Sequence, residues 1–385
     1  MTHAGLSEPD WDAFVDAAHP TSYLQRSAWA AAKAPNGWRA VRWFGGDSPG
    51  APVEASGPNR VGAQVLIRRV RFTPWSIAYA PRGPLAQTWS DNTIAAFTRA
   101  ARLKMAALPD RVAYLRIEPA LDPDIDEHEA GERATWLASR LLAAGWRRAP
   151  AVQPTASRIV DLRVGEAALW SGLRKKWRQY VNRARADGVR VVDGDGDRLA
   201  DFYAIYRETA RRAGFIIRSE GSYRDVWTAF DREGLARLLF AELPDGTPVA
   251  TLLLLRSGAT VTEPFGGITV AGSEHRANYL LKWDAMNRSR DAGAETYDMW
   301  GLSSPGIAHF KAGFGGREVR YAGAWDLVLD PVGRSILEGA RRARISVSRV
   351  QHGLDPRHRV SPDGTRPADD PDPGQPTGGG EDQRS

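Results

Sequence analysis

The sequence predicts an α+β chain made of two similarly built units and a polar tail. Its 385 residues are too many for one typical domain and enough for two hydrophobic cores. Each half shows a hairpin pattern followed by a strand, a helix and a strand, which indicates an internal duplication too diverged to appear as identities. From about residue 354 onward, Pro, Gly and Asp dominate and large apolar residues are scarce, so a disordered tail is expected.

The first half is predicted to open with two short helices and then to alternate strands with longer helices. Ser27 is suited to cap the second short helix, SAWAAAK, and Lys33 follows at its end before a Pro-Asn-Gly break. By position alone, that lysine serves the helix dipole. The expected helices are 10–18, 27–33, 91–108 and 132–144, and the expected strands are 38–44, 63–71, 75–79 and 113–117.

The second half begins with a strand at 154–162 and the most basic element of the chain, LWSGLRKKWRQYVNRARADGVRVV. Apolar and aromatic residues recur there at helical spacing and are expected to face the core. A separate basic stripe comprises Lys175, Arg178, Asn182 and Arg185. Such a stripe is either a solvated face or a surface that follows an RNA or diphosphate backbone, and the sequence leaves both interpretations open.

The remaining elements repeat the plan of the first half. Arg218 stands beside a glycine turn in GFIIR, where it would bind a phosphate or carboxylate or form a structural ion pair. An arginine-rich helix at 332–350 is expected to dock on the first half or against an acidic surface. The other expected elements are helices at 199–213, 223–232 and 277–291, a hairpin around 244–246, and strands at 260–266, 296–300 and 321–329.

The stretch YDMWGLSSPGIAHFKAGFGG is predicted to carry chemistry. A Gly/Ser/Pro loop delivers Phe310 and Lys311 just before a glycine cluster that allows close approach of backbone to a ligand. Lysine is scarce here, because only six of the 52 Lys and Arg residues are lysines. A retained lysine indicates a need for a compact charge or a titratable amine, although a solvated lysine on a hairpin is the alternative.

Composition excludes several classes of protein. The chain has no cysteine, which rules out disulfides, thiolate metal sites and a thiol nucleophile. Its seven histidines form no HxxxH or HExxH pair, so no metal is expected. There is no signal-peptide pattern, and the strongest apolar run, 249–255, is far too short to span a membrane, so a cytoplasmic protein is expected.

The charge distribution favours anionic partners. The net charge is +6, but residues 354–385 hold seven acidic and four basic residues, so the rest of the chain carries +9. Phosphates, nucleic acid and a membrane face all remain open on this basis.

The order of strands and helix in each half is also that of the acyl-CoA-dependent N-acetyltransferase (GNAT-like) fold. In that fold an R-x-x-G-x-G/A loop at the helix start wraps the cofactor pyrophosphate with backbone N–H groups. The matching residues 276–281 read RANYLL, which lacks both glycines, and Tyr279 would crowd the phosphates. Coenzyme A is therefore a poor fit.

Seven motifs in order resemble the Fem (FemAB/FemX-like) family of aminoacyl-tRNA-dependent transferases, which build peptidoglycan interpeptide bridges. They span about residues 20–329 and are YLQRSAWAAAKAPNGW, YAPRGP, PTASRIVDLRVGEAALWSGLRKKWRQYVNRARADGVRV, RRAGFIIRSEGSY, ANYLLKWDAM, TYDMWGL and HFKAGFGG. The resemblance implies two tandem acetyltransferase-like domains, 1–150 plus 317–350 and 151–316, followed by a disordered tail at 351–385. No heptad run marks the coiled-coil arm that some members insert.

The resemblance also implies roles for particular residues. Lys33 and Arg218 match residues that grip the phosphates of a UDP-linked or lipid-linked muramyl pentapeptide, and Tyr223 would line the same cleft. Phe310 and Lys311 match the pair that shapes the aminoacyl-tRNA site and stabilises the reaction. The basic stripe described above, and not the resemblance, makes Lys175, Arg178 and Arg185 candidates for contact with the tRNA.

The implied activity is transfer of an amino acid from aminoacyl-tRNA to a stem-peptide amine in cell-wall cross-bridge synthesis. It needs no cofactor, since the ester is already activated, and peripheral contact with the membrane is a further expectation. Glu263, Asp298 and the substrate's own carboxylates remain open as the general base. Two alternatives remain: an acyl-CoA-dependent N-acyltransferase acting on a small amine, and a non-catalytic protein that binds tRNA or other nucleic acid.

Overall fold

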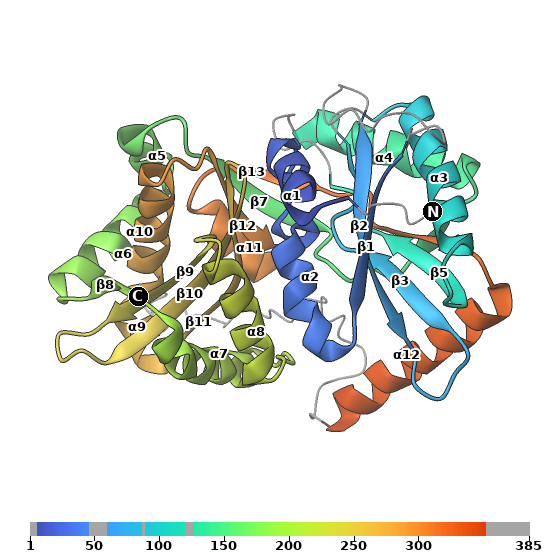
Figure 1. The fold of residues 1–385 in the computed structure, drawn as a ribbon. Helices are drawn as coiled ribbons and strands as arrows, with labels where there is room; N and C mark the ends of the chain where they lie inside the picture. The colour runs from blue at the N-terminus through green and yellow to red at the C-terminus, as the bar shows by residue number, and fades with distance from the viewer. Residues whose placement is uncertain (1–5, 46–59, 87–88, 121–126, 352–385) are drawn as a thin grey trace, which may run out of the picture.

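The computed structural model describes residues 6–45, 60–86, 89–120 and 127–351, and it contains two seven-stranded sheets (Figure 1). The first sheet has the order β1-β2-β3-β5-β14-β6, with β4 paired to β2. Its strands are β1 (Arg39–Gly45), β2 (Val61–Arg69), β3 (Ser76–Ala80), β4 (Leu85–Ala86), β5 (Val112–Ile117), β6 (Arg147–Ala149) and β14 (Ala324–Val328).

The second sheet has the order β13-β7-β12-β11-β10-β9-β8. Its strands are β7 (Ala156–Asp161), β8 (Arg190–Gly194), β9 (Ala236–Glu242), β10 (Pro248–Ser257), β11 (Thr260–Ile268), β12 (Thr296–Gly301) and β13 (Arg317–Arg320). The two sheets share one plan. Each has an antiparallel series of strands whose last member is connected through a helix, α3 (Asp91–Ala106) or α10 (Ala277–Asp291), to a parallel neighbour.

The other helices pack against the sheets or lie between the two units. They are α1 (Glu8–Ala17), α2 (Ser27–Lys33), α4 (Glu127–Ala143), α5 (Glu166–Gly172), α6 (Lys175–Ala186), α7 (Leu199–Ala213), α8 (Glu220–Asp231), α9 (Val270–Glu274), α11 (Pro305–Ala312) and α12 (Pro331–Gln351). Short 3-10 turns lie at Tyr23–Gln25, Ala34–Asn36 and Gly196–Arg198. Among the described helices, none combines the length and the apolar composition that a membrane crossing requires.

Helix α2 lies between the two halves of the molecule (Figure 1). Six of its seven residues are buried, which is the pattern of a helix covered on all sides. Its small alanines allow close packing against α8, and one hydrophobic core joins Tyr23 and Trp29 to Phe230 and Trp300 of the second half. The two sheets therefore share this core, in addition to a core of their own.

Polar groups reinforce the contact between the two halves. Arg26, which is 6% exposed, forms ion pairs with Asp16 and, at 2.8 Å, with Glu233 of the second half. Gln25, just before α2, binds to the first sheet: its Oε1 accepts from the Gln64 N–H of β2 at 2.8 Å, and its Nε2 donates to the carbonyl of Pro81, just after β3, at 2.8 Å. The position of α2 is thus fixed by both units.

The predicted α+β architecture is confirmed, and so are most element boundaries to within a few residues. The stretch 151–316 is described throughout, and its longest helices, α7 and α10, have 15 residues each, so no coiled-coil arm projects from it. Of the predicted tail, 351–385, residue 351 ends the last helix and the rest lies outside the described residues.

One predicted element differs from the structure. The expected Gly/Ser/Pro loop before Lys311 contains helix α11, because Ser304 caps its N-terminus and Pro305 is favourable in the first helical turn. The division of the chain into domains stays a prediction. Strand β13, however, pairs with β7 of the second sheet, so the chain returns to the first sheet after Arg320 instead of at residue 317.

The shared core predicts a single unfolding transition. Leu24 is 1% exposed within it, so we expect Leu24→Ala to lower the free energy of unfolding by about 2–5 kcal/mol, measured by urea titration. The matched control Leu142→Ala removes a side chain that is 53% exposed and should change it by less than about 0.5 kcal/mol. Two separate transitions, with only one shifted by Leu24→Ala, would contradict a shared core.

Candidate functional site

Lys33 ends α2 with its side chain buried. The residue is 7% exposed, and its Nζ lies 3.9 Å from the centroid of the Trp29 ring. Burial, and to a smaller extent the nearby Arg218 charge, lower the pKa of Lys33 to about 7, against the opposing effect of Asp225. A bound anion would favour the charged form and raise this pKa again.

Arg218 lies between α7 and α8; its side chain is exposed, and hydrogen bonds fix its backbone. Its N–H donates to the Tyr223 hydroxyl at 3.2 Å, and its carbonyl accepts from the Tyr203 hydroxyl at 3.3 Å. Tyr223 is only 4% exposed and packs against Phe202 and Phe265. The structure thus places Tyr223 beneath the Arg218 segment, which it supports. That Tyr223 also lines the cleft for the muramyl pentapeptide stays a prediction.

Lys311 projects from α11 toward the end of β12. Its Nζ donates to the carbonyl of Gly301 at 2.6 Å and to that of Trp300 at 3.2 Å. Trp300 has a φ of +61°, a left-handed conformation that is rare for a residue other than glycine. Such strained residues gather at functional sites.

Asp298 is a buried carboxylate near Lys311. Its Oδ1 accepts from the Ser157 hydroxyl and, at 2.8 Å, from the Trp300 N–H. Burial raises the pKa of Asp298, while these hydrogen bonds and the charges of Arg82 and Lys311 act against the rise. The cation and the carboxylate named from the sequence are therefore close enough to interact.

Arg82 is a site residue that the sequence analysis did not single out. It is 3% exposed, its φ is +50°, and its Nη2 donates to the Pro154 carbonyl at 2.7 Å. Its guanidinium carbon lies 3.6 Å from the Tyr321 ring centroid and 5.1 Å from that of Trp300. The available signal was the motif YAPRGP, in which an arginine sits between two prolines in a rigid turn.

A continuous path of contacts connects Lys33 to Lys311 across the two units. Lys33 lies over Trp29, whose ring centroid is 5.5 Å from that of Tyr23. Tyr23 lies 5.6 Å from Trp300 by the same measure, and the Trp300 carbonyl accepts from Lys311. We call this path, together with Arg82, Arg218 and Asp298, the junction site.

Charged groups along the same path influence the pKa of Tyr23. Burial raises the pKa of Tyr23, while the charges of Arg82 and Arg218 lower it and that of Asp298 raises it. Tyr23 therefore interacts with groups at both ends of the junction site. Three cations predicted from distant parts of the sequence thus belong to one connected region.

Phe310 and Glu263 belong to a neighbouring part of the second unit. The Phe310 ring packs against Tyr279 at a centroid distance of 5.3 Å, on a different side of α11 from Lys311. Both oxygens of buried Glu263 are engaged, Oε1 by Lys282 and Oε2 by the Tyr297 hydroxyl at 2.9 Å. The Lys282 Nζ lies 5.8 Å from the Phe310 centroid.

The predicted RNA stripe on α6 is partly used for internal contacts. Arg178 donates to three carbonyl oxygens at the C-terminus of α5, at 2.6 to 3.4 Å. The guanidinium carbon of Arg185 lies 5.8 Å from the Trp170 ring centroid, while Lys175 is exposed at the start of α6. Contact of these three residues with tRNA stays a prediction.

Comparison with known proteins gives one consistent answer. The model of the FemAB family matches residues 6–245 and 240–340. The chain is 23% identical over 252 residues to a lipid II:glycine glycyltransferase of Staphylococcus aureus, which covers 63% of this chain and 55% of that protein. The chain thus spans about half the length of the curated relatives it matches.

Solved structures show the same fold. The crystal structure of FemX superposes with a TM-score of 0.73 at 19% identity, covering 88% of this chain and 100% of that one. A protein of unknown function from Bacteroides thetaiotaomicron gives a TM-score of 0.50 at 10% identity, covering 85% of this chain and 98% of that one. At these identities the likeness establishes the fold alone.

The lowered pKa of Lys33 predicts a pH-dependent cost to stability. Because the folded pKa lies below that of the unfolded chain, the unfolded state binds more protons between about pH 7 and 10.5, and the penalty is fully present below pH 7. We expect Lys33→Met to raise the free energy of unfolding at pH 6 by on the order of a few kcal/mol, and by less at pH 9.5. Lys104→Met, at an exposed position, is the control; an equal gain for Lys33→Met at both pH values would contradict the account.

Proposed function

This chain belongs to the FemAB family, and from that membership we propose that it transfers an amino acid from aminoacyl-tRNA to a stem-peptide amine of a peptidoglycan precursor. The glycyltransferase named for lipid II among its relatives supports this class of reaction. The observation that carries the proposal is the path of contacts that joins Lys33 to Lys311 across the two units.

The acceptor's phosphates are proposed to bind at Lys33 and Arg218. The two cations are close enough that the Arg218 charge lowers the pKa of Lys33, an arrangement that is unfavourable unless an anion is present. A diphosphate would interact with both groups and offset part of the cost of burying Lys33. Tyr203 and Tyr223 hold the backbone of Arg218 in place for this contact.

Lys311 is proposed to stabilise the transition state. The acceptor amine attacks the ester carbonyl, the N–C bond forms, and the ester C–O bond breaks to release the tRNA hydroxyl with a proton. The charge that develops on the carbonyl oxygen needs a fixed donor, and the Lys311 ammonium is held by the carbonyls of Trp300 and Gly301.

Asp298 is proposed as the group that takes the proton from the acceptor amine. The hydrogen bonds that the structure gives Asp298 both go to Oδ1. Glu263 is the poorer choice because Lys282 and Tyr297 each bind one of its oxygens. Burial also raises the pKa of Asp298, which brings the carboxylate closer to the range of a useful base.

The donor is proposed to be an aminoacyl ester, with no cofactor required. Tyr279 stands in the first turn of α10, where an acetyltransferase would cradle the pyrophosphate of coenzyme A. Its ring is 7% exposed and packs against Trp177, Phe310 and Phe314. Aromatic packing at this point supports aminoacyl-tRNA over acyl-CoA as the donor.

We expect Lys311→Ala to lower kcat by about 10²-fold with little change in KM, because the interaction strengthens in the transition state. The assay combines charged total tRNA with UDP-linked or lipid-linked muramyl pentapeptide and detects the product by mass. Lys104→Ala is the control at an exposed lysine. Turnover of Lys311→Ala close to wild type would remove Lys311 from the mechanism. If product formed only when acyl-CoA was supplied, the donor would be acyl-CoA and not aminoacyl-tRNA.

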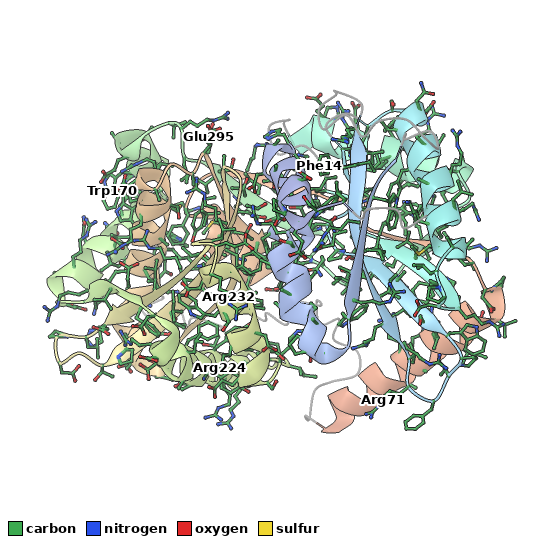
Figure 2. The ribbon with its side chains drawn as sticks, in the orientation of Figure 1. Phe14, Arg71, Trp170, Arg224, Arg232 and Glu295 are labelled. Atoms are coloured by element: carbon green, nitrogen blue, oxygen red, sulfur yellow. The ribbon has the colours of Figure 1, made fainter. Side chains whose placement is uncertain are left out.

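We expect Lys33→Ala and Arg218→Ala each to weaken binding of the UDP-linked muramyl pentapeptide by about tenfold or more, because each loses a charge-assisted contact with phosphate. Calorimetric titration measures this. Arg224→Ala, an exposed arginine on the adjacent helix α8 that pairs with Glu220, is the matched control (Figure 2). Unchanged affinity in both variants would refute the phosphate role.

A further inference from the structure

The turn between β2 and β3 presents a phenylalanine entirely to solvent. Phe72 is 102% exposed and has a φ of +62°. A left-handed conformation costs free energy for a residue with a Cβ, and water is an unfavourable environment for an aromatic ring. A residue kept there against both costs points to a partner that covers the ring.

Helix α12 presents two further apolar side chains to solvent. Val332 is 62% exposed and Ile336 is 49% exposed, and their spacing places them on one flank of the helix. Gly333 and Leu337 face the sheet instead, since Trp75 lies against Gly333 and Leu337 is buried beside Tyr114.

The flank that carries Val332 and Ile336 faces the β2–β3 turn. On the other flank, Arg334 bonds to Asp326 of β14 at 2.9 Å and Glu338 bonds to Arg116 of β5 at 2.8 Å. Since the sheet order is β2-β3-β5-β14, the flank opposite to β14 is the one toward β3 and β2.

The turn and the helix are also tied together directly. The Trp75 indole N–H donates to Asp330 at 2.8 Å, immediately before α12. Figure 2 labels Arg71, on this turn, at the lower edge of the molecule, where α12 is also drawn. Phe72, Val332 and Ile336 therefore lie on the same side of the first unit, and we call these three exposed residues the apolar trio.

The surroundings of the apolar trio are basic. Arg71 is exposed on the same turn as Phe72. The acidic groups nearby are matched by arginines: Asp330 pairs with Arg111, and Glu338 pairs with Arg116 and Arg341. The local charge is therefore positive, as in the chain up to residue 353.

We propose that the apolar trio, with Arg71, docks on the surface of an anionic lipid bilayer. Exposed apolar side chains flanked by arginines are the combination that inserts into the interface of a membrane while pairing with anionic headgroups. The trio lies on a turn and on the flank of a helix, so its side chains can enter the membrane interface without any change in the backbone. The inference rests on the proposed function in one respect: docking would bring the junction site to a lipid-linked acceptor.

Vesicle sedimentation tests the proposal with the full chain. We expect binding to vesicles that contain phosphatidylglycerol and little binding to phosphatidylcholine alone. Phe72→Ser should lower the partition coefficient by about tenfold or more, and Val332→Ser with Ile336→Ser should do the same. Arg71→Gln should lower it by about fivefold, with the loss reduced at high salt.

Matched controls lie on the opposite face of the first sheet. Leu103 on α3 is 64% exposed, so Leu103→Ser removes a comparable apolar side chain, and Arg99→Gln removes a charge from the same helix. Both should bind vesicles as the wild type does. No binding to anionic vesicles, or an equal loss in Leu103→Ser and Phe72→Ser, would overturn the proposal. So would self-association in solution that Phe72→Ser abolishes without any vesicle binding.

A paired transfer assay separates this inference from the proposed function. Phe72→Ser should keep wild-type transfer to the UDP-linked acceptor and lose at least about tenfold on the lipid-linked acceptor in anionic vesicles. Vesicle binding without transfer to either acceptor would refute the proposed function and leave the docking surface standing. Transfer to both acceptors without vesicle binding would refute the docking surface and leave the proposed function standing.

Discussion

The position of α2 between the two sheets is the constraint on which the rest of the structure depends. A seven-residue helix has little stability of its own, so its place is set by packing. Tyr23 and Trp29 bury their rings against Phe230 and Trp300, which binds the two units into one core. The residue that ends this helix, Lys33, is thereby placed at the contact between units.

Burial of Lys33 has an electrostatic consequence. An ammonium that is 7% exposed and near a second cation is costly to keep charged, and so its pKa falls to about 7. Most folds avoid such an arrangement, because a hydrophobic residue would be more stable there. The arrangement makes physical sense as a site that an anion completes, with Lys311 at the other end of the same path of contacts. The buried Lys33 lowers the stability of the fold, and Trp300 and Arg82 have strained backbones with positive φ. All three residues belong to the junction site, where the reaction is proposed to take place.

The local features of the fold were predictable, and the contacts that join distant residues were not. Periodicity and caps predicted α10 and the strand that follows it, and the motifs selected Lys33, Arg218 and Lys311. Helix α11 was missed because its glycine-rich and serine-rich flanks resemble a loop. The route from Trp29 through Tyr23 to Trp300 and the role of Arg82 were missed because ring contacts across two units leave no local pattern. The burial of Phe72 against a partner could be inferred only once its exposure and its neighbour α12 were known.

The most direct test of this account is the number of protons taken up when the UDP-linked muramyl pentapeptide binds. Calorimetric titrations near pH 7.5, in buffers of different ionisation enthalpy, measure it. If Lys33 is held near pKa 7 by burial and Arg218 and is recharged by the bound phosphates, the wild type takes up a substantial fraction of a proton, and Lys33→Met takes up none. Tight binding by the wild type with no proton uptake would contradict the account.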